Sequence, residues 1–328
     1  MKASLDGSNQ SGEKMAAMDE LPLVLVHALP PFEISFKGRL QSRFQLIDSL
    51  DSTFAPHVSV LLCVGPSPVS SDTLRHLPSL QCIVGSSAGV DHIDLAECRR
   101  RGITVTNAGP SFCEDGADFA IGLLIDVLRR ISAADRYVRA GLWPMKGDYP
   151  LGSKLGGKRV GIVGLGNIGS EIAKRLVAFG CRIAYNSRNK KSSVSFPYYA
   201  NICNLAANSD ILIICCALTK ETHHLINKDV MTALGKEGVI INVGRGALIN
   251  EKELVQCLEQ GQIRGAGLDV FENEPDVPKE LFELENVVLS PHKAIATPES
   301  FASLQELIVG NLEAFFSNKP LLSPVNLE

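Results

Sequence analysis

The sequence predicts an α/β protein with two doubly wound parallel sheets, one of them in a domain that the chain enters twice. Two observations lead to this prediction. Short apolar runs alternate with longer amphipathic stretches from about residue 23 onward, which is the pattern of parallel β-α-β units. The chain also has 328 residues, about twice the ~150 residues of a typical domain.

The first series of apolar runs predicts four strands, each followed closely by Gly, Pro or Ser. These strands are 23–27, 58–64, 80–84 and 103–106. A long helix is expected next, over about 114–140, because apolar residues recur there at helical spacing. Gly141 is well placed to end it.

A second series of apolar runs predicts one complete doubly wound sheet. Its strands are 159–163, 182–185, 210–215, 239–242, 267–269 and 287–289. A last helix, 298–316, has no later strand to pack with, so we expect it to fold back onto the first domain. The predicted organisation is a mobile tail (1–20), a split domain (21–112 plus 296–328) and a continuous domain (113–295).

Composition excludes several classes of protein. The 32 basic and 36 acidic side chains leave a net charge of −4, so no broad cationic surface is available for nucleic acid. The longest apolar run, 211–218, is far shorter than the ~20 residues of a membrane span. Nine cysteines without a C-x-x-C pair fit a reducing compartment. Because the first 20 residues match neither a secretory nor a transit peptide, we expect a cytoplasmic protein.

The run 160–169 (VGIVGLGNIG) is a buried strand that leads through G-x-G-x-x-G into a helix expected over 170–179. In this Rossmann-like context the first glycine permits a tight turn, the second lets the backbone approach a pyrophosphate, and the third lets helix and strand pack closely. A bare glycine-rich turn is the alternative, and the strand–turn–helix context favours a dinucleotide site. The predicted contacts are Gly164, Leu165, Gly166, Asn167, Ile168 and Gly169.

The end of the next strand indicates which dinucleotide is bound. An NAD site would carry an acidic residue there for the ribose 2′-hydroxyl, but the sequence has Asn186, Ser187 and Arg188 instead. Ser187 can donate a hydrogen bond to a 2′-phosphate, and Arg188 can pair with it through two N–H groups. We therefore expect NADP(H) to be preferred over NAD(H). The alternative is a solvated surface turn, since Arg also stacks on adenine in NAD sites.

Three polar residues follow the last strands of the second series, where doubly wound sheets bind their ligands. They are Arg245 (in 242–246, NVGRG), Glu274 (in 269–275, DVFENEP) and His292 (in 289–292, LSPH). A guanidinium can hold a carboxylate through two hydrogen bonds, and an imidazolium can protonate an oxygen. A carboxylate beside the histidine fixes its orientation. Together they suit reduction of a 2-oxo acid by hydride.

These motifs resemble the D-isomer-specific 2-hydroxyacid dehydrogenase family, and most closely its glyoxylate/hydroxypyruvate reductase branch. The resemblance covers nearly everything after residue 20. It is carried by four ordered motifs, which together are far more specific than any one of them: 164–169 (GLGNIG), 242–249 (NVGRGALI), 267–275 (GLDVFENEP) and 290–292 (SPH).

The resemblance implies roles for individual residues. Arg245 would anchor the substrate carboxylate and carbonyl, His292 would donate the proton, and Glu274 would pair with His292. Further contacts are implied for the cofactor at Val243, Gly244, Arg245 and Asp269, and for the substrate carboxylate at the backbone of Ser87, Ala88 and Gly89. The implied reaction is NADPH-dependent reduction of glyoxylate or hydroxypyruvate to glycolate or D-glycerate.

The remaining histidines and the lone tryptophan lead to two further expectations. No metal ion is expected, since His27, His57, His76 and His92 lack metal-ligand spacing and the pair 223–224 is expected to open a helix. Trp143 lies in a segment that, by the family resemblance, forms a homodimer interface and reaches the partner's pocket. The alternative is that Trp143 only covers a domain edge.

Two alternative functions remain at this point. One is a corepressor or redox sensor that binds the dinucleotide on the same fold without consuming it. The other is a dehydrogenase acting on formate or on a phosphorylated serine precursor. Formate oxidation needs no proton exchange at a substrate oxygen, so the Glu274 and His292 pair favours 2-hydroxy acids.

Overall fold

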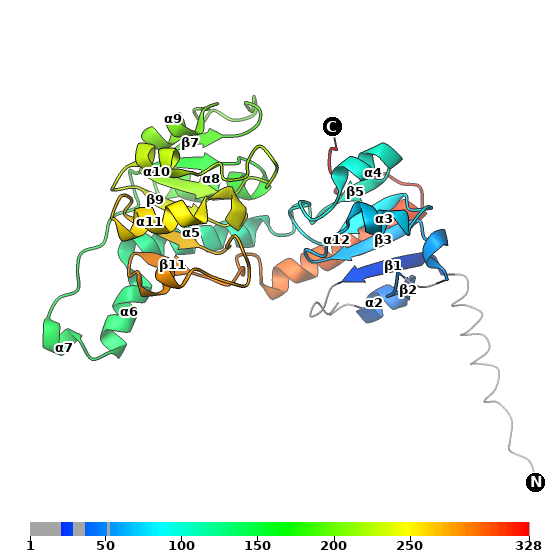
Figure 1. The fold of residues 1–328 in the computed structure, drawn as a ribbon, viewed down its shortest axis with the longest axis horizontal. Coiled ribbons are helices and arrows are strands. Elements are labelled where there is room, and N and C mark those ends of the chain that lie inside the picture. Colours follow the sequence, from blue (N-terminus) through cyan, green and yellow to red (C-terminus); the bar gives the residue numbers. More distant parts are fainter. Residues whose placement is uncertain (1–20, 29–36, 51–52, 328) are drawn as a thin grey trace, which may run out of the picture. The chain divides into compact units, whose positions relative to one another are not determined.

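The computed structural model describes residues 21–28, 37–50 and 53–327, which form two compact units (Figure 1). The first unit contains the described residues up to Ser111 and those from Phe301 on, and the second is Phe112–Ser300. The tail predicted at 1–20 lies outside the described residues. Every strand pairing within both sheets is parallel, which confirms the predicted fold class.

The continuous unit begins one residue earlier and ends five residues later than the predicted 113–295. Its last residues are tied to it by side-chain hydrogen bonds. The Thr297 hydroxyl donates to Oδ1 of Asp115 at 2.5 Å, and the Ser300 hydroxyl donates to the carbonyl oxygen of Ile295. Residues 296–300 therefore belong with the second unit.

The first unit is built on a five-stranded sheet of order β2-β1-β3-β4-β5. Its strands are β1 (Leu23–Ala28), β2 (Gln45–Ile47), β3 (Val60–Val64), β4 (Cys82–Gly85) and β5 (Thr104–Thr106). Its short helices are α2 (Lys37–Gln41), the 3-10 turn η1 (Ala55–His57), α3 (Ser71–Arg75) and α4 (Leu95–Arg101). The short edge strand β2 was not predicted from the sequence.

The last helix, α12 (Pro298–Phe316), has the predicted bounds, and its residues from Phe301 on belong to the first unit. The Arg39 guanidinium forms two hydrogen bonds with the Glu306 carboxylate, at 2.5 and 2.9 Å. Buried Asn311 binds the chain beyond the helix, accepting the amide of Leu322 and donating to the Ser323 hydroxyl. The two ends of the described chain thus build one unit.

The second unit has a six-stranded sheet of order β11-β10-β9-β8-β6-β7. The strands are β6 (Arg159–Val163), β7 (Arg182–Asn186), β8 (Ile211–Ile214), β9 (Val239–Asn242), β10 (Gly265–Leu268) and β11 (Val287–Leu289). After β6 the chain forms β7, which lies on one side of β6, and then β8, which lies on the other side of β6. This switch point beside β6 is where open α/β sheets bind ligands, beyond the carboxyl ends of their strands.

Helices cover both faces of this second sheet, so its strands are buried on both sides. Ile211 and Ile213 pack in a cluster with α5 (Cys113–Arg129) and α8 (Asn167–Ala178). Leu212 and Ile214 pack on the opposite face. The helices there are α9 (Ile202–Ala207), α10 (Lys228–Leu234) and α11 (Glu251–Glu259). Burial on both faces explains why these strands have almost continuous apolar sequences.

The predicted long helix 114–140 is wrong, because the structure breaks it into α5 and α6 (Ile131–Arg139). Arg130 adopts a left-handed backbone, with φ of 57°, and ends α5. The Asp126 carboxylate then accepts the amide of Ser132 at 2.8 Å and so stabilises the start of α6. The apolar spacing continues across the break, so periodicity gave no signal of it.

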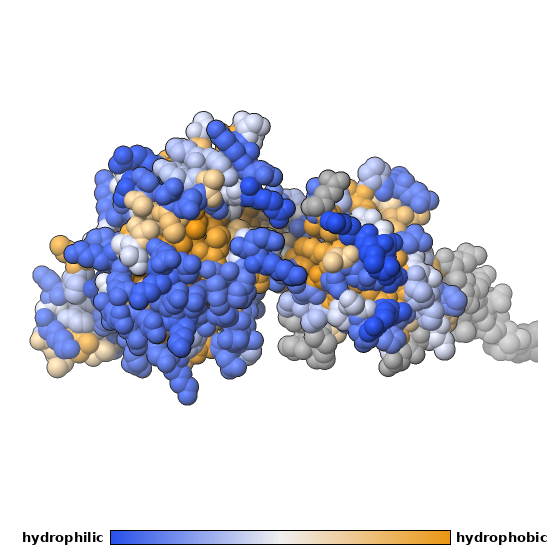
Figure 2. Space-filling model, turned by 45° about the horizontal axis from the view of Figure 1, so that its top comes forward, coloured by the Kyte–Doolittle hydropathy of each residue, from blue (hydrophilic) through white to orange (hydrophobic). Residues whose placement is uncertain are grey.

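A short helix, α7 (Trp143–Lys146), follows in the same segment. Large apolar side chains are exposed here, including Val138, Trp143, Met145 and Leu151. Figure 2 shows pale orange side chains at the left edge of the view, where α7 lies. Within the described part of the chain, no helix is long and apolar enough to cross a membrane.

Candidate active site

The glycine-rich turn after β6 packs as the motif predicts, and the helix after it starts earlier than predicted. Gly164 has a φ of 99°, and a Cβ there would lie 2.5 Å from Cα of Cys216. A Cβ on Gly169 would lie 2.1 Å from the carbonyl oxygen of Gly164. Helix α8 begins at Asn167 instead of Ser170, because Gly166 acts as its N-cap. The second half of the motif is therefore the first turn of the helix.

Gly166 differs from the other two glycines of the motif. A Cβ on Gly166 would have no described atom within 4 Å, so this position faces open space. Gly166, the N-cap residue of α8, has no side chain that could cap the helix. The positive potential at this helix N-terminus can therefore act on a phosphate placed in the open space.

The three residues expected to recognise the cofactor's ribose lie at the end of β7. The side chain of Asn186 donates to the carbonyl oxygens of Tyr199 and Ala200, at 2.8 and 3.2 Å, so it anchors a loop. The Ser187 hydroxyl donates to the carbonyl oxygen of Asn189, and the Arg188 side chain is exposed. None of these three residues is acidic.

Arg245 is held in a loop by the buried side chain of Asn242 at the end of β9. Asn242 Oδ1 accepts the amide of Gly244 at 3.0 Å, and its Nδ2 donates to the carbonyl oxygen of Arg245 at 2.9 Å. After Arg245 the chain enters the 3-10 turn η2 (Gly246–Leu248). A Cβ on Gly246 would lie 1.9 Å from the carbonyl carbon of Phe271, so the Arg245 loop packs directly on the loop that follows β10.

His292 and Glu274 form a hydrogen-bonded pair. Nδ1 of His292 lies 2.7 Å from Oε2 of Glu274, and Oε1 of Glu274 accepts the amide of Phe271 at 3.0 Å. Burial raises the pKa of Glu274, but the hydrogen bonds from His292 and the Phe271 amide and the charges of His292 and Arg245 outweigh it. The pKa of Glu274 is therefore below its ordinary value.

Asp269, which the family resemblance assigns to the cofactor, holds the loop that carries His292. Its buried carboxylate accepts the amides of Lys293 and Ala294 at 2.8 and 2.9 Å. The Asp269 carbonyl oxygen accepts the amide of His292 at 2.7 Å, and His292 has a left-handed backbone with φ of 52°. The loop is thus fixed by hydrogen bonds to the end of β10.

Ser87, Ala88 and Gly89, the predicted substrate contacts in the first unit, lie in a half-buried loop after β4. The carbonyl oxygen of Ser87 accepts the amide of Ala108 at 2.9 Å, and that of Ala88 accepts Nδ2 of Asn107 at 3.0 Å. The loop backbone is therefore anchored to the chain that follows β5.

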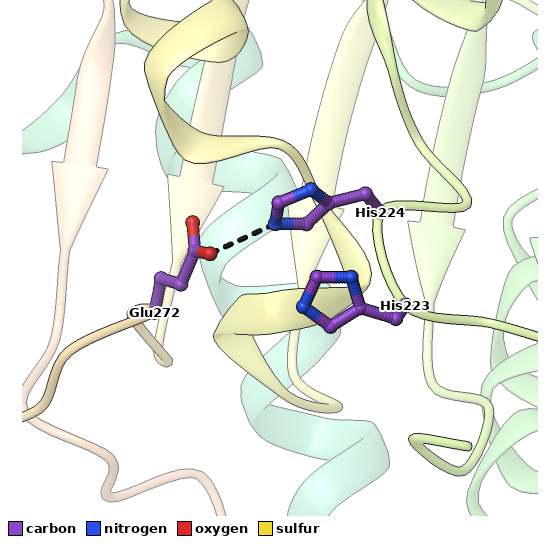
Figure 3. Close-up of side chains that lie close together, drawn as sticks. All are labelled: His223, His224 and Glu272. Atoms are coloured by element: carbon purple, nitrogen blue, oxygen red, sulfur yellow. Dashed lines mark hydrogen bonds and ion pairs between the residues drawn. The ribbon is translucent and has the colours of Figure 1, made fainter. Parts of the chain in front are cut away.

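A cluster of polar side chains beside the Glu274 loop was not predicted from the sequence. His223 and His224 lie in a turn and do not open α10, which begins at Lys228 with Asn227 as its cap. Nε2 of His224 lies 2.8 Å from Oε1 of Glu272 (Figure 3). Glu251, at the start of α11, accepts the amide of Glu272 at 3.1 Å. Burial foremost, and then the charges of Glu272 and Glu274, raise the pKa of Glu251.

Two doubly wound sheets, the glycine-rich turn and the Glu274–His292 pair define an oxidoreductase of the Rossmann type. The model of the D-isomer specific 2-hydroxyacid dehydrogenase NAD binding domain matches residues 121–294. The chain belongs to the D-isomer-specific 2-hydroxyacid dehydrogenase family.

Two curated plant proteins are similar over most of their length. A glyoxylate/hydroxypyruvate reductase of Arabidopsis thaliana is 57% identical over 325 residues, which cover 96% of this chain and 100% of that protein. A hydroxyphenylpyruvate reductase of Plectranthus scutellarioides is 50% identical over 269 residues, covering 81% of this chain and 86% of the relative.

A solved structure extends the similarity to three dimensions. It is the NADPH-dependent glyoxylate/hydroxypyruvate reductase of Sinorhizobium meliloti in complex with NADP and malonate. Its TM-score is 0.85 at 39% sequence identity, and the match covers 93% of this chain and 97% of that one.

Proposed function

We propose that this protein reduces glyoxylate and hydroxypyruvate to glycolate and D-glycerate with NADPH. The observation that carries the proposal is the 2.7 Å pair of His292 and Glu274, with the charge of Arg245 acting on the same carboxylate. The Arabidopsis thaliana and Sinorhizobium meliloti reductases support the substrate class.

The second unit fits a bound dinucleotide. The open space at Gly166 and the positive N-terminal end of α8 would hold the pyrophosphate, and the run 242–245 with Asp269 would contact the nicotinamide side. When bound, the cofactor supplies the hydride that is added to C2 of the 2-oxo acid. The residues of the chain have to bind the acid, orient it and deliver a proton to its oxygen.

His292 donates that proton from Nε2, because Nδ1 is engaged by Glu274. Arg245 holds the substrate carboxylate and offsets charge that develops on the carbonyl oxygen. Donors of this kind contribute a few kcal/mol to lowering a barrier. The reverse reaction needs unprotonated His292, so oxidation is favoured at higher pH than reduction.

Cofactor preference, assembly and location are further parts of the proposal. Ser187 and Arg188, with no carboxylate at the end of β7, favour NADP(H). The exposed apolar side chains of α6 and α7 favour a homodimer with Trp143 at its interface. Burial raises the pKa of the Cys63 and Cys82 thiols to about 12, so they act as small core residues, which suits the reducing cytoplasm.

A kinetic panel tests the proposal. Purified protein is assayed for loss of reduced nicotinamide absorbance with glyoxylate, hydroxypyruvate, pyruvate and hydroxyphenylpyruvate, each with NADPH and with NADH. We expect the highest kcat/KM for glyoxylate or hydroxypyruvate with NADPH. Binding of NADPH without consumption would favour a sensor, and near wild-type turnover of His292→Ala would exclude His292 as the proton donor.

A further inference from the structure

Apart from the Glu274–His292 pair, three side chains with metal-binding atoms converge where the turn 220–224 meets the loop after β10. They are His223 and His224 from the turn and Glu272 from the loop (Figure 3). One ligand atom from each lies within 4.8 Å of the other two. Among the residues that the structure describes, this is the one group of three His, Cys, Asp or Glu side chains with that property.

The backbone turns both histidines to the same side. His224 has a φ of 51°, a left-handed conformation in which histidine is found more often than most residues. The two rings are in contact, with centroids 3.9 Å apart and planes inclined by 31°. The amide of His223 donates to the carbonyl oxygen of Thr219, and that of His224 to Ala247. The turn is therefore fixed by main-chain hydrogen bonds and not by the ring contact alone.

Glu272 is held in place from the other side. Its amide donates to the Glu251 carboxylate at 3.1 Å, which leaves its own carboxylate directed at the histidines. The side chains of His224 and Glu272 are 32% and 27% exposed, and His223 is exposed, so a cation can reach all three from solvent.

We propose that His223, His224 and Glu272 bind a divalent transition-metal cation of the zinc class. Two imidazoles and one carboxylate are a donor set that Zn²⁺ takes in proteins, with a fourth position left to water. Ligands at 2.0–2.1 Å in tetrahedral geometry lie about 3.4 Å apart. The three ligand atoms now lie within 4.8 Å of one another, so metal binding requires them to adjust to that spacing, and the His223 side chain is exposed. No metal was expected from the sequence, because the other histidines lack metal-ligand spacing and the pair 223–224 was expected to open a helix.

The proposed cation links two loops without using the residues assigned to the reaction. Glu272 faces the histidines, whereas Glu274, two residues later, faces His292. A bound cation joins the turn 220–224 to the loop after β10 and so stabilises the second unit. We expect the bound cation to raise the Tm, and we expect its binding not to depend on His292.

Titration of the full-length protein with ZnCl₂ by calorimetry, and with CoCl₂ by visible absorption, tests the site. We expect one equivalent per chain, and cobalt bands of four-coordinate geometry without a thiolate charge-transfer band. His223→Ala and Glu272→Gln should each weaken binding by more than the roughly tenfold that loss of an outer-shell partner costs. His76→Ala, another exposed histidine, and His292→Asn should bind as the wild type does.

Two results would overturn the proposal. One is equal binding by the wild type and His223→Ala, which would leave His224 and Glu272 as a structural pair only. The other is a thiolate band, which would place the metal on cysteine. His223→Ala is the decisive variant because its side chain is exposed, and circular dichroism without metal verifies that it folds.

Discussion

Nδ1 of His292 lies 2.7 Å from Oε2 of Glu274, whose other carboxylate oxygen accepts the Phe271 amide. Glu274→Gln keeps the shape of this pair and removes its charge. We expect kcat with glyoxylate to fall about a hundredfold, the lower range for an acid–base contribution, with KM for NADPH unchanged. Steady-state kinetics measure both. Glu283→Gln, an exposed carboxylate of the same unit, is the control, and equal kcat values for both variants would contradict a role for the pair.

Two glycines of the motif 164–169, Gly166 and Gly169, are expected to fail in different ways when replaced by Ala. In Gly169→Ala the new Cβ meets the carbonyl oxygen of Gly164, so the free energy of unfolding should fall by about 1–3 kcal/mol. Gly166→Ala meets no described atom and should unfold like the wild type, but its methyl group enters the space assigned to the pyrophosphate. Urea unfolding and fluorescence titration with NADPH separate the two effects. Unchanged NADPH affinity in Gly166→Ala would place the phosphates elsewhere.

Arg188 offers a test of cofactor preference. Loss of a charge-assisted hydrogen bond costs about 1.5–3 kcal/mol, so Arg188→Ala should raise KM for NADPH roughly tenfold to a hundredfold and leave KM for NADH unchanged. Lys190→Ala, in the same turn, is the matched control. An equal rise for both cofactors would instead indicate that Arg188 stacks on adenine.

Several strands could be predicted from the sequence with their bounds, for a physical reason. Strands β6, β9 and β11 have the predicted bounds. In β6 and β9 nearly every residue is buried, and burial on both faces makes a run continuously apolar. Parallel strands also end at one edge of the sheet, so Arg245, Glu274 and His292 could be grouped without a structure. The family resemblance implied that Glu274 pairs with His292; the structure gives their distance, 2.7 Å, and adds that the charge of Arg245 acts on Glu274.

The features that sequence reasoning missed depend on contacts between distant residues or on one backbone angle. Strand β2 has three half-buried residues and no apolar run. The break at Arg130 is a single left-handed residue inside a continuing periodicity. The contact of His224 with Glu272 joins segments 48 residues apart, and only the fold brings them together.

The segment with α6 and α7 predicts a dimer interface. Trp143 is 58% exposed and Met145 is 78% exposed, which is a large apolar surface to leave in water. Met145→Asp should convert a dimeric wild type into monomers in light scattering coupled to gel filtration. Phe179→Asp, which also changes an exposed apolar residue, should remain dimeric. A monomeric wild type, or a dimeric Met145→Asp, would show that this segment is not the interface.

The Asp210 carboxylate joins the starts of β6 and β8 and predicts how acid destabilises the second unit. It accepts the amide of Arg159 at 2.8 Å and Nη2 of its guanidinium at 2.7 Å. Partial burial raises the pKa of Asp210, but these hydrogen bonds and the charges of Arg159 and Lys158 outweigh burial and lower it from the ordinary value of 3.8. The unfolded chain therefore binds the proton more tightly than the folded one. The contribution of Asp210 to stability is complete at pH values above its ordinary pKa of 3.8. It is lost as the pH falls through the lower pKa that Asp210 has in the folded state.

Asp210→Asn should thus lower the free energy of unfolding at neutral pH by about 1 kcal/mol, since the ion pair is partly exposed. The difference from the wild type should stay constant from neutral pH down to about one unit above 3.8, and should shrink below that. Urea unfolding across this pH range measures the difference, with Asp148→Asn, an exposed aspartate, as the control. In strong acid the Asp210 side chain is neutral, as the Asn side chain is at every pH. A difference that persists unchanged there would mean that Asp210 stabilises the fold by its shape and hydrogen bonds and not by its charge.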